Sequence, residues 1–201
     1  MNTKYDGLIF DMDGVLVDVS ESYREAIRQT AGYFLKKNVL MSEVNEMKNK
    51  SGMNNDWDAS YALINKPEIS YKMVKDYFQK IYLGGLIDKE KLLISKQELQ
   101  FLKNKYKKLG IATGRPKKEA EYVIKKNKLE TIFDCVLALE DVAKSKPAPD
   151  SILAVIKKLN LKQTIYIGDS QCDFLAAKLA KIPYINVDKT KTLLQVIKYL
   201  L

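Results

Sequence analysis

The strongest constraint on the fold is a regular alternation of two kinds of segment from residue 95 onward. Stretches with apolar residues at helical spacing alternate with short, almost wholly apolar stretches that are typical of buried strands. The predicted helices cover residues 95–110, with a stop at Gly110, and 116–129, 148–161, 171–182 and 190–201; the predicted strands cover 109–113, 133–139, 163–169 and 183–188. Strand, helix and strand in sequence indicate a parallel sheet with helices on both faces. We therefore expect an α/β fold.

The first half of the chain follows a different pattern. A strand is predicted over residues 5–10, and helical patterns follow near residues 20–38, 42–50, 56–65 and 70–82, ending near the flexible pair Gly84–Gly85. Because the strand–helix alternation begins only after this block, the block is an insertion behind the first strand. We expect a core of residues 1–17 and 89–201 and an inserted all-helical cap domain of residues 18–88.

The composition limits the chemistry that the chain can perform. The 201 residues include no histidine, which excludes Ser-His and Cys-His nucleophile systems and histidine-bound zinc. The only cysteines, Cys135 and Cys172, lie far apart and match no metal-ligand spacing. Catalysis would depend on carboxylates, lysines, hydroxyl groups and a hard metal ion.

The composition also limits the partners. The net charge is +9, but only Arg24, Arg28 and Arg115 among the 34 basic residues are arginine, and no basic stretch is interleaved with aromatic residues. We therefore expect no nucleic-acid partner. No apolar run approaches membrane-spanning length, and the chain enters its first strand without a signal-peptide pattern. The expectation is a cytoplasmic protein without a membrane partner.

Polar residues gather directly after the predicted strands, at the edge of a parallel sheet where ligands bind. In "LIFDMDGVLVD", residues 8–18, Asp11 and Asp13 end the first strand, and positions i and i+2 of an extended segment face the same way. An acid before a glycine is common turn chemistry, but that reading leaves the acids at a second strand end unexplained. The later strand ends supply Thr113, Gly114, Arg115, Lys144, Lys146, Asp169 and Asp173.

Four motifs in these positions resemble those of the haloacid dehalogenase superfamily. "DMDGVLVD", "ATGR", "KPAPD" and "GDSQCD" stand in the order of that family and span residues 11–173. Their joint occurrence is far more specific than any one motif. The chain looks like a phosphatase-like member of subfamily I, which implies a Rossmann-like core with a helical (C1-type) cap.

The resemblance implies roles for the first two acids. Asp11 would be the nucleophile that attacks phosphorus and carries a phosphoaspartyl intermediate. Asp13 would protonate the leaving alcohol and later activate the attacking water. These roles need opposite protonation states, which a neighbouring carboxylate and a cation help to maintain.

The resemblance also implies a Mg²⁺ cofactor, because this hard cation takes oxygen ligands. The Asp11 side chain, the Asp13 backbone carbonyl and Asp169 would bind it, and Asp173 would support it directly or through a water molecule. A second interpretation of Asp173 remains open, as a first-turn acid that stabilises its helix.

Phosphate binding would fall to Thr113, through its hydroxyl group, and to Gly114, through an unobstructed backbone N–H. Lys146 would balance the negative charge of acids and phosphate. Lys144 lies close by in sequence, but the match to "KPAPD" favours Lys146.

Three further residues have two open interpretations. Arg115 is either a substrate or cap contact, or a salt-bridge or helix-start residue. Asn54 and Asn55 precede Trp57, the sole tryptophan, and form either a specificity loop over the substrate or a helix cap beside an aromatic packed in the cap.

The leading functional hypothesis is a Mg²⁺-dependent phosphomonoester hydrolase acting on a small phosphorylated metabolite. The alternatives are a phosphomutase of the β-phosphoglucomutase type and a phosphonate hydrolase that uses Lys48 or Lys50 of the cap as a Schiff base. A non-catalytic binding protein on the same scaffold is a further alternative. The sequence leaves monomer and homodimer both open.

Overall fold

The computed structural model describes residues 4–50, 53, 55–187, 193 and 195–196. The chain divides into two compact units, one formed by Met1–Asp18 with Leu92–Leu201 and the other by Val19–Lys91. We call them the sheet unit and the helical unit. The expected assignment of residues 18–88 as a cap stays a prediction. The predicted closing helix over 190–201 lies, except for residues 193, 195 and 196, outside the described part of the chain.

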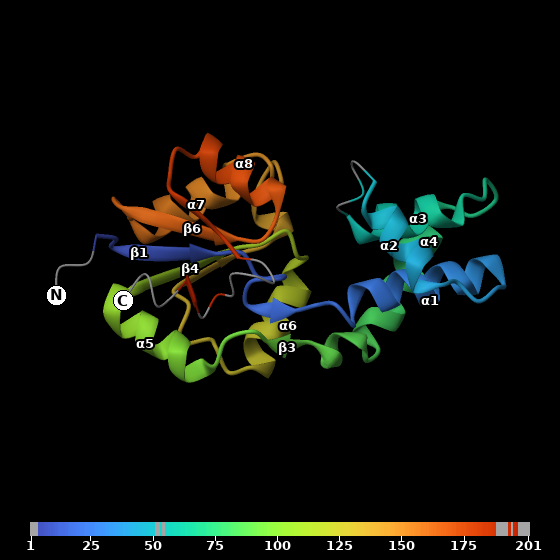
Figure 1. The fold of residues 1–201 in the computed structure, drawn as a ribbon, viewed down its shortest axis with the longest axis horizontal. Coiled ribbons are helices and arrows are strands. Elements are labelled where there is room, and N and C mark those ends of the chain that lie inside the picture. Colours follow the sequence, from blue (N-terminus) through green and yellow to red (C-terminus); the bar gives the residue numbers. More distant parts are fainter. Residues whose placement is uncertain (1–3, 51–52, 54, 188–192, 194, 197–201) are drawn as a thin grey trace. The chain divides into compact units, whose positions relative to one another are not determined.

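The sheet unit is built on five parallel strands in the order β5-β4-β1-β6-β7. Their bounds are Gly7–Phe10 for β1, Lys108–Ala112 for β4, Cys135–Leu137 for β5, Thr164–Gly168 for β6 and Tyr184–Asn186 for β7. In the register, Phe10 of β1 pairs with Ile111 of β4 and Ile167 of β6. The residues that follow these three positions therefore meet at one edge of the sheet (Figure 1).

Helices cover both faces of this sheet. Figure 1 shows α7 and α8 on one side and α5 and α6 on the other. Their bounds are Lys96–Tyr106 for α5, Lys117–Lys126 for α6, Asp150–Leu159 for α7 and Gln171–Leu179 for α8, and a short 3-10 helix, η2, covers Leu139–Asp141. The expected α/β fold with a parallel sheet flanked by helices is confirmed.

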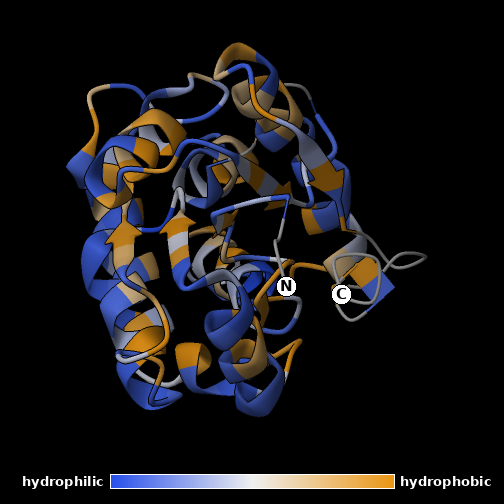
Figure 2. Ribbon diagram, turned by 90° about the vertical axis from the view of Figure 1, so that its left-hand side faces the viewer, coloured by the Kyte–Doolittle hydropathy of each residue, from blue (hydrophilic) through white to orange (hydrophobic). Residues whose placement is uncertain are grey.

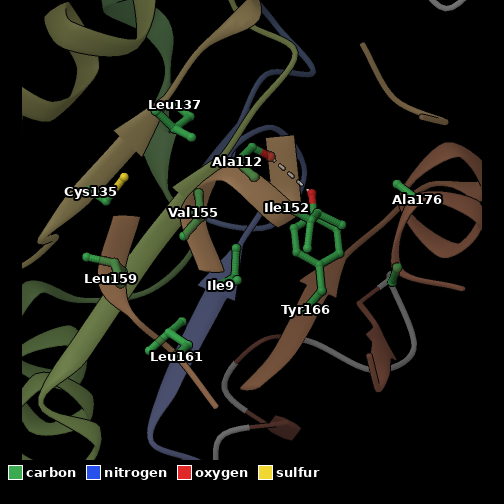
Figure 3. Packing of buried hydrophobic residues seen from close by; sticks show 11 residues of the cluster. Ile9, Ala112, Cys135, Leu137, Ile152, Val155, Leu159, Leu161, Tyr166 and Ala176 are labelled. Atoms are coloured by element: carbon green, nitrogen blue, oxygen red, sulfur yellow. Dashed lines mark hydrogen bonds between the residues drawn. The ribbon is translucent and has the colours of Figure 1, made fainter. Parts of the chain in front are cut away.

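The core of the sheet unit forms where α7 and α8 pack on the strands. Figure 3 shows Ile152, Val155 and Leu159 of α7 against the side chains of β1, β4 and β5. All three point to one face of α7 because they recur every three or four residues. Figure 2 shows the same division by hydropathy, with hydrophobic strands and helices that carry both hydrophobic and hydrophilic bands.

The predicted helix stop at Gly110 is wrong. Helix α5 ends at Tyr106, and Lys107 turns the chain with a φ of +62°. Gly110 lies inside β4, where an added Cβ would lie 2.4 Å from Cγ1 of Val155. The glycine therefore allows the close approach of α7 to the sheet.

The helical unit contains α1 (Tyr23–Leu35), α2 (Met41–Lys48), α3 (Asp56–Ile64), α4 (Tyr71–Leu83) and the 3-10 helix η1 (Leu86–Lys89). Helix α1 packs against α2, α3 and α4. The buried carboxylate of Glu90 links two segments of this unit, because it accepts hydrogen bonds from Ser22 (2.8 Å) and Tyr82 (2.7 Å). The predicted helical insertion after the first strand is confirmed.

Two short strands lie where the chain passes from one unit to the other. β2 (Val17–Asp18) pairs with β3 (Lys91–Leu92) in a separate two-stranded sheet. Within the described ranges, no helix combines the length and the apolar character that crossing a membrane requires.

Candidate active site

The site is built at the carboxyl edge of the sheet, beginning with the turn after β1. The backbone N–H of Asp11 donates to the carbonyl of Ile167 (2.8 Å), so β1 stays paired with β6 up to the first acid. Gly14 then turns the chain with a φ of +72°, a conformation that glycine adopts without steric cost. An added Cβ at Gly14 would lie 2.0 Å from Oδ2 of Asp169. The glycine thus makes room for the acid that directly follows β6.

Lys146 joins two of the acids. Its Nζ lies 2.7 Å from Oδ1 of Asp11 and 2.6 Å from Oδ1 of Asp173. All three side chains are at most 10% exposed. The structure therefore brings the lysine of "KPAPD" to the acids of two other motifs, whereas Lys144 is exposed.

Tyr166 on β6 is a contact that the sequence reasoning missed. Its hydroxyl group accepts a hydrogen bond from Lys146 (2.9 Å) and lies within donating distance of Oδ1 of Asp173 (2.9 Å) and the carbonyl of Ala112 (3.1 Å). Figure 3 shows the bond to Ala112. The ring is completely buried, so the hydroxyl fixes the lysine from inside the core. The available signal was a tyrosine between two isoleucines in a strand that precedes a motif acid.

Asp173 also caps helix α8. Its backbone N–H donates to Oγ of Ser170 (3.2 Å), and its Oδ2 accepts from the backbone N–H (3.1 Å) and the hydroxyl group (2.5 Å) of Ser170. This reciprocal arrangement is a capping box. Because Oδ1 is bonded to Lys146 and Tyr166, both oxygens of Asp173 are engaged by protein donors. The helix-stabilising interpretation of Asp173 is therefore confirmed, and its support of a metal ion stays a prediction.

The surroundings of the acids shift their pKa values in different directions. Burial raises the pKa of Asp11 well above its usual value, and the charges of Asp173 and Asp13 add to this effect against the opposing charge of Lys146. Burial would raise the pKa of Asp173 too, but Lys146 and the hydrogen bonds from Ser170 and Tyr166 lower it below the ordinary value.

Two further shifts follow from the same charges. Removal from water by the surrounding protein, together with the charges of Asp173 and Asp13, raises the pKa of Asp169 to about 7. For Lys146, burial alone would lower the pKa, but the two carboxylates outweigh it and raise the pKa. At this edge of the sheet, the negative charge of the acids is therefore larger than the positive charge of Lys146, unless another cation binds.

Asp11, Asp169 and Asp173 could hold a metal ion. Each offers a carboxylate oxygen, and these oxygens lie within 4.8 Å of one another. An all-oxygen donor set suits a hard divalent cation. The raised pKa values of Asp11 and Asp169 agree with this fit, because a bound dication would offset the mutual repulsion of the acids.

Thr113 and Gly114 follow β4 at the same edge. The backbone N–H of Thr113 donates to Leu137 of β5 (3.0 Å), and its side-chain oxygen accepts from the backbone N–H of Arg115 (3.1 Å). Gly114 is exposed, and no atom lies within 4 Å of the position that a Cβ would take. The turn thus leaves open space beside the Gly114 backbone.

Arg115 is turned inward to Asp13. Its Nε donates to Oδ1 of Asp13 at 2.6 Å, and its side chain is 0% exposed while that of Asp13 is 31% exposed. The structure therefore gives Arg115 the salt bridge that one of its two interpretations required.

In the helical unit, Asn55 is the N-cap of α3. Its Oδ1 accepts from the backbone N–H groups of Trp57 (2.8 Å) and Asp58 (3.2 Å). The ring of Trp57 lies under the ammonium group of Lys75, 3.8 Å from the ring centroid. Asn54 lies outside the described residues.

The two lysines named for a Schiff base are in different surroundings. Lys48 forms an ion pair with Asp56 (2.8 Å), and Lys50 is exposed.

Comparison with known proteins identifies relatives along almost the whole chain. The family model described as haloacid dehalogenase-like hydrolase matches residues 8–187. A fold match of TM-score 0.77 and 19% identity covers 99% of this chain and 98% of a haloacid dehalogenase superfamily hydrolase, subfamily IA, from Geobacter sulfurreducens.

Three curated proteins are similar in sequence. A phosphorylated carbohydrates phosphatase of Thermotoga maritima is 29% identical over 88% of this chain and 82% of its own length. The fructose-1-phosphate phosphatase YqaB of Escherichia coli is 25% identical over 93% of this chain and 98% of its own length. An imidazoleglycerol-phosphate dehydratase of Phytophthora nicotianae is 31% identical over 90% of this chain, but the chain spans only 42% of that protein.

Proposed function

Because the chain belongs to the haloacid dehalogenase-like hydrolases, we propose that it is a Mg²⁺-dependent phosphatase that cleaves small phosphate monoesters through a phosphoaspartyl intermediate. The observation that carries the proposal is the convergence of Asp11, Asp173 and Lys146 from three separate segments of the chain, with Asp169 beside them. A core built only for stability gains little from acids gathered in this way.

Asp11, Asp169 and the backbone carbonyl of Asp13 are the proposed ligands of Mg²⁺. Asp173 would support the ion through a water molecule, since Lys146, Tyr166 and Ser170 already engage both of its oxygens. When bound, the ion supplies positive charge that orients the phosphate and offsets its charge.

In the first chemical step, an oxygen of Asp11 forms a bond to phosphorus while the ester P–O bond breaks. The proton of Asp13 passes to the departing oxygen, so the product is an alcohol and Asp13 becomes a carboxylate. Lys146 lies 2.7 Å from Asp11 and holds that side chain in place during the transfer.

In the second step, a water oxygen bonds to the phosphorus of the phosphoaspartyl group and the Asp11–phosphorus linkage breaks. Asp13 takes the proton of the water, which returns both acids to their starting forms. The Thr113 hydroxyl group and the Gly114 backbone N–H are the proposed donors to the phosphoryl oxygens.

The proposed substrates are small phosphate esters. Relatives that are named as phosphatases of phosphorylated carbohydrates and of fructose 1-phosphate support this class. The net charge of +9 favours anionic substrates in general. Two free cysteines and no disulfide among the described residues are consistent with a reduced cytoplasm, which we propose as the compartment.

The test is phosphate release from a panel of esters with and without Mg²⁺. The panel includes fructose 1-phosphate, other sugar phosphates, phosphoglycolate, histidinol phosphate and pyrophosphate. Wild type is compared with Asp11→Asn and with Asp141→Asn, a matched change at an acid that pairs with Lys117.

The expected result is Mg²⁺-dependent release by wild type and by Asp141→Asn, and none by Asp11→Asn. Activity that survives in Asp11→Asn would contradict the phosphoaspartyl route. A sugar phosphate that is isomerised without release of phosphate would instead identify a mutase.

A further inference from the structure

Arg115 is one of the largest completely buried side chains in the described part of the chain, and it lies beside the proposed acid. Its guanidinium group crosses from the turn after β4 to the turn after β1 and donates Nε to Oδ1 of Asp13 at 2.6 Å. Burying a guanidinium group is costly unless a partner compensates for the lost water. The pair with Asp13 supplies such compensation.

The backbone of Arg115 is fixed as firmly as its side chain. The N–H donates to Oγ1 of Thr113 (3.1 Å), and the carbonyl accepts from the N–H of Leu139 (2.9 Å). The guanidinium group therefore extends from a rigid turn. Because the Arg115 side chain is 0% exposed whereas that of Asp13 is 31% exposed, Asp13 is the member of the pair that a substrate can reach.

We propose that Arg115 is a positioning residue that holds the carboxyl group of Asp13 in the orientation required for proton transfer to the leaving group. This inference rests on the proposed phosphatase function and assigns Arg115 to the acid, not to substrate selection. Arg115 acts through Asp13, and it faces the negative charge that develops there as the proton leaves.

The proposal has a consequence that depends on the leaving group. An ester with a good leaving group, such as p-nitrophenyl phosphate, departs as a stable anion and needs little protonation. Benzyl phosphate releases an alkoxide unless an acid supplies a proton. A misplaced acid therefore slows the cleavage of benzyl phosphate much more than the cleavage of p-nitrophenyl phosphate.

The experiment measures kcat/KM of wild type, Arg115→Gln and Arg115→Lys on both esters with Mg²⁺. We expect Arg115→Gln to lose about 10-fold to 100-fold on benzyl phosphate and less than about 3-fold on p-nitrophenyl phosphate. Arg115→Lys keeps the charge and should lie between Arg115→Gln and wild type. Because the ratio of the two rates is taken within one preparation, a lower fraction of folded protein cancels.

Two controls make the result specific. Lys117→Gln breaks the ion pair with Asp141 two residues further along the same segment and should leave the ratio unchanged. In an Asp13→Asn background, Arg115→Gln should cause no further loss on benzyl phosphate, because residues that act as a unit are not additive.

Losses of equal size on the two esters, or an additional loss in the Asp13→Asn background, would overturn this role of Arg115 and leave the proposed function intact. If wild type releases phosphate from neither ester nor from any member of the panel, the proposed function fails and this inference fails with it.

Discussion

The raised pKa of Asp169 predicts how the stability of the metal-free protein depends on pH. The pKa is about 7 in the folded chain against an ordinary 3.8, so the folded protein binds this proton more tightly than the unfolded chain does. Its contribution to stability is therefore complete below pH 3.8 and is lost as the pH rises to about 7, with no further change above.

The size of the expected loss in unfolding free energy depends on the pH interval over which stability is measured. Each unit of pKa difference corresponds to about 1.4 kcal/mol, so the loss between pH 5.5 and 7 is about 2 kcal/mol for a fully enclosed group. The Asp169 side chain reaches solvent at the sheet edge, and screening reduces this figure to about 1 kcal/mol.

The assay is urea unfolding in EDTA at pH 5.5 and pH 8, for wild type, Asp169→Asn and Asp141→Asn. Wild type should lose about 1 kcal/mol more than Asp169→Asn over this interval. Asp141 is the matched control because hydrogen bonding and Lys117 lower its pKa, so it does not titrate in the interval. Equal losses in wild type and Asp169→Asn would refute the assignment of the shift to Asp169.

Three further predictions concern the same edge of the sheet. Mg²⁺ should raise the melting temperature of wild type more at pH 8 than at pH 5.5, since protons compete with the metal for carboxylates, and a pH-independent shift would contradict the proposed ligands. Gly14→Ala should lower kcat/KM at least about 10-fold, because its Cβ would displace the carboxylate of Asp169; unchanged kinetics would show that the turn adapts. Tyr166→Phe should lower the free energy of unfolding by about 1–2 kcal/mol in urea, because the mutation removes a buried hydroxyl group bonded to Lys146 and Asp173. Retention of full stability would contradict that estimate.

The order of strands and helices could be predicted because it depends on local pattern. Every residue of β1 and β6 is buried, so these segments are mostly apolar without the alternation of a half-exposed strand, and this pattern could be recognised in the sequence. The position of the acids followed from the same rule, since parallel strands end at one edge. The stop at Gly110 failed because its small size serves the packing of α7, a contact between segments about 45 residues apart that local sequence does not reveal.

The contacts between the site residues were harder to predict than the residues themselves. Lys146 could be selected by its motif, yet the sequence alone does not reveal that Tyr166 fixes its ammonium group. Likewise, the partner of Arg115 lies 102 residues earlier in the chain. Such pairs depend on the distance between two loops. The whole sheet sets that distance, and the residues next to either partner in sequence do not.

The charges of these residues explain why a dication, and not a monovalent ion, suits the edge. Two buried cations, Lys146 and Arg115, reach the acids from two different loops and contact Asp11, Asp173 and Asp13. With Asp11, Asp169 and Asp173 ionised and Asp13 protonated, as the proposed first step requires, the acids exceed these two cations by one charge. At Asp169, burial and then the charges of Asp173 and Asp13 raise the pKa against the opposing charge of Lys146. A bound dication leaves these groups with a net positive charge that can receive a phosphate anion, whereas a monovalent ion only neutralises them. Na⁺ or K⁺ at the same concentration should therefore fail to replace Mg²⁺ in the melting assay.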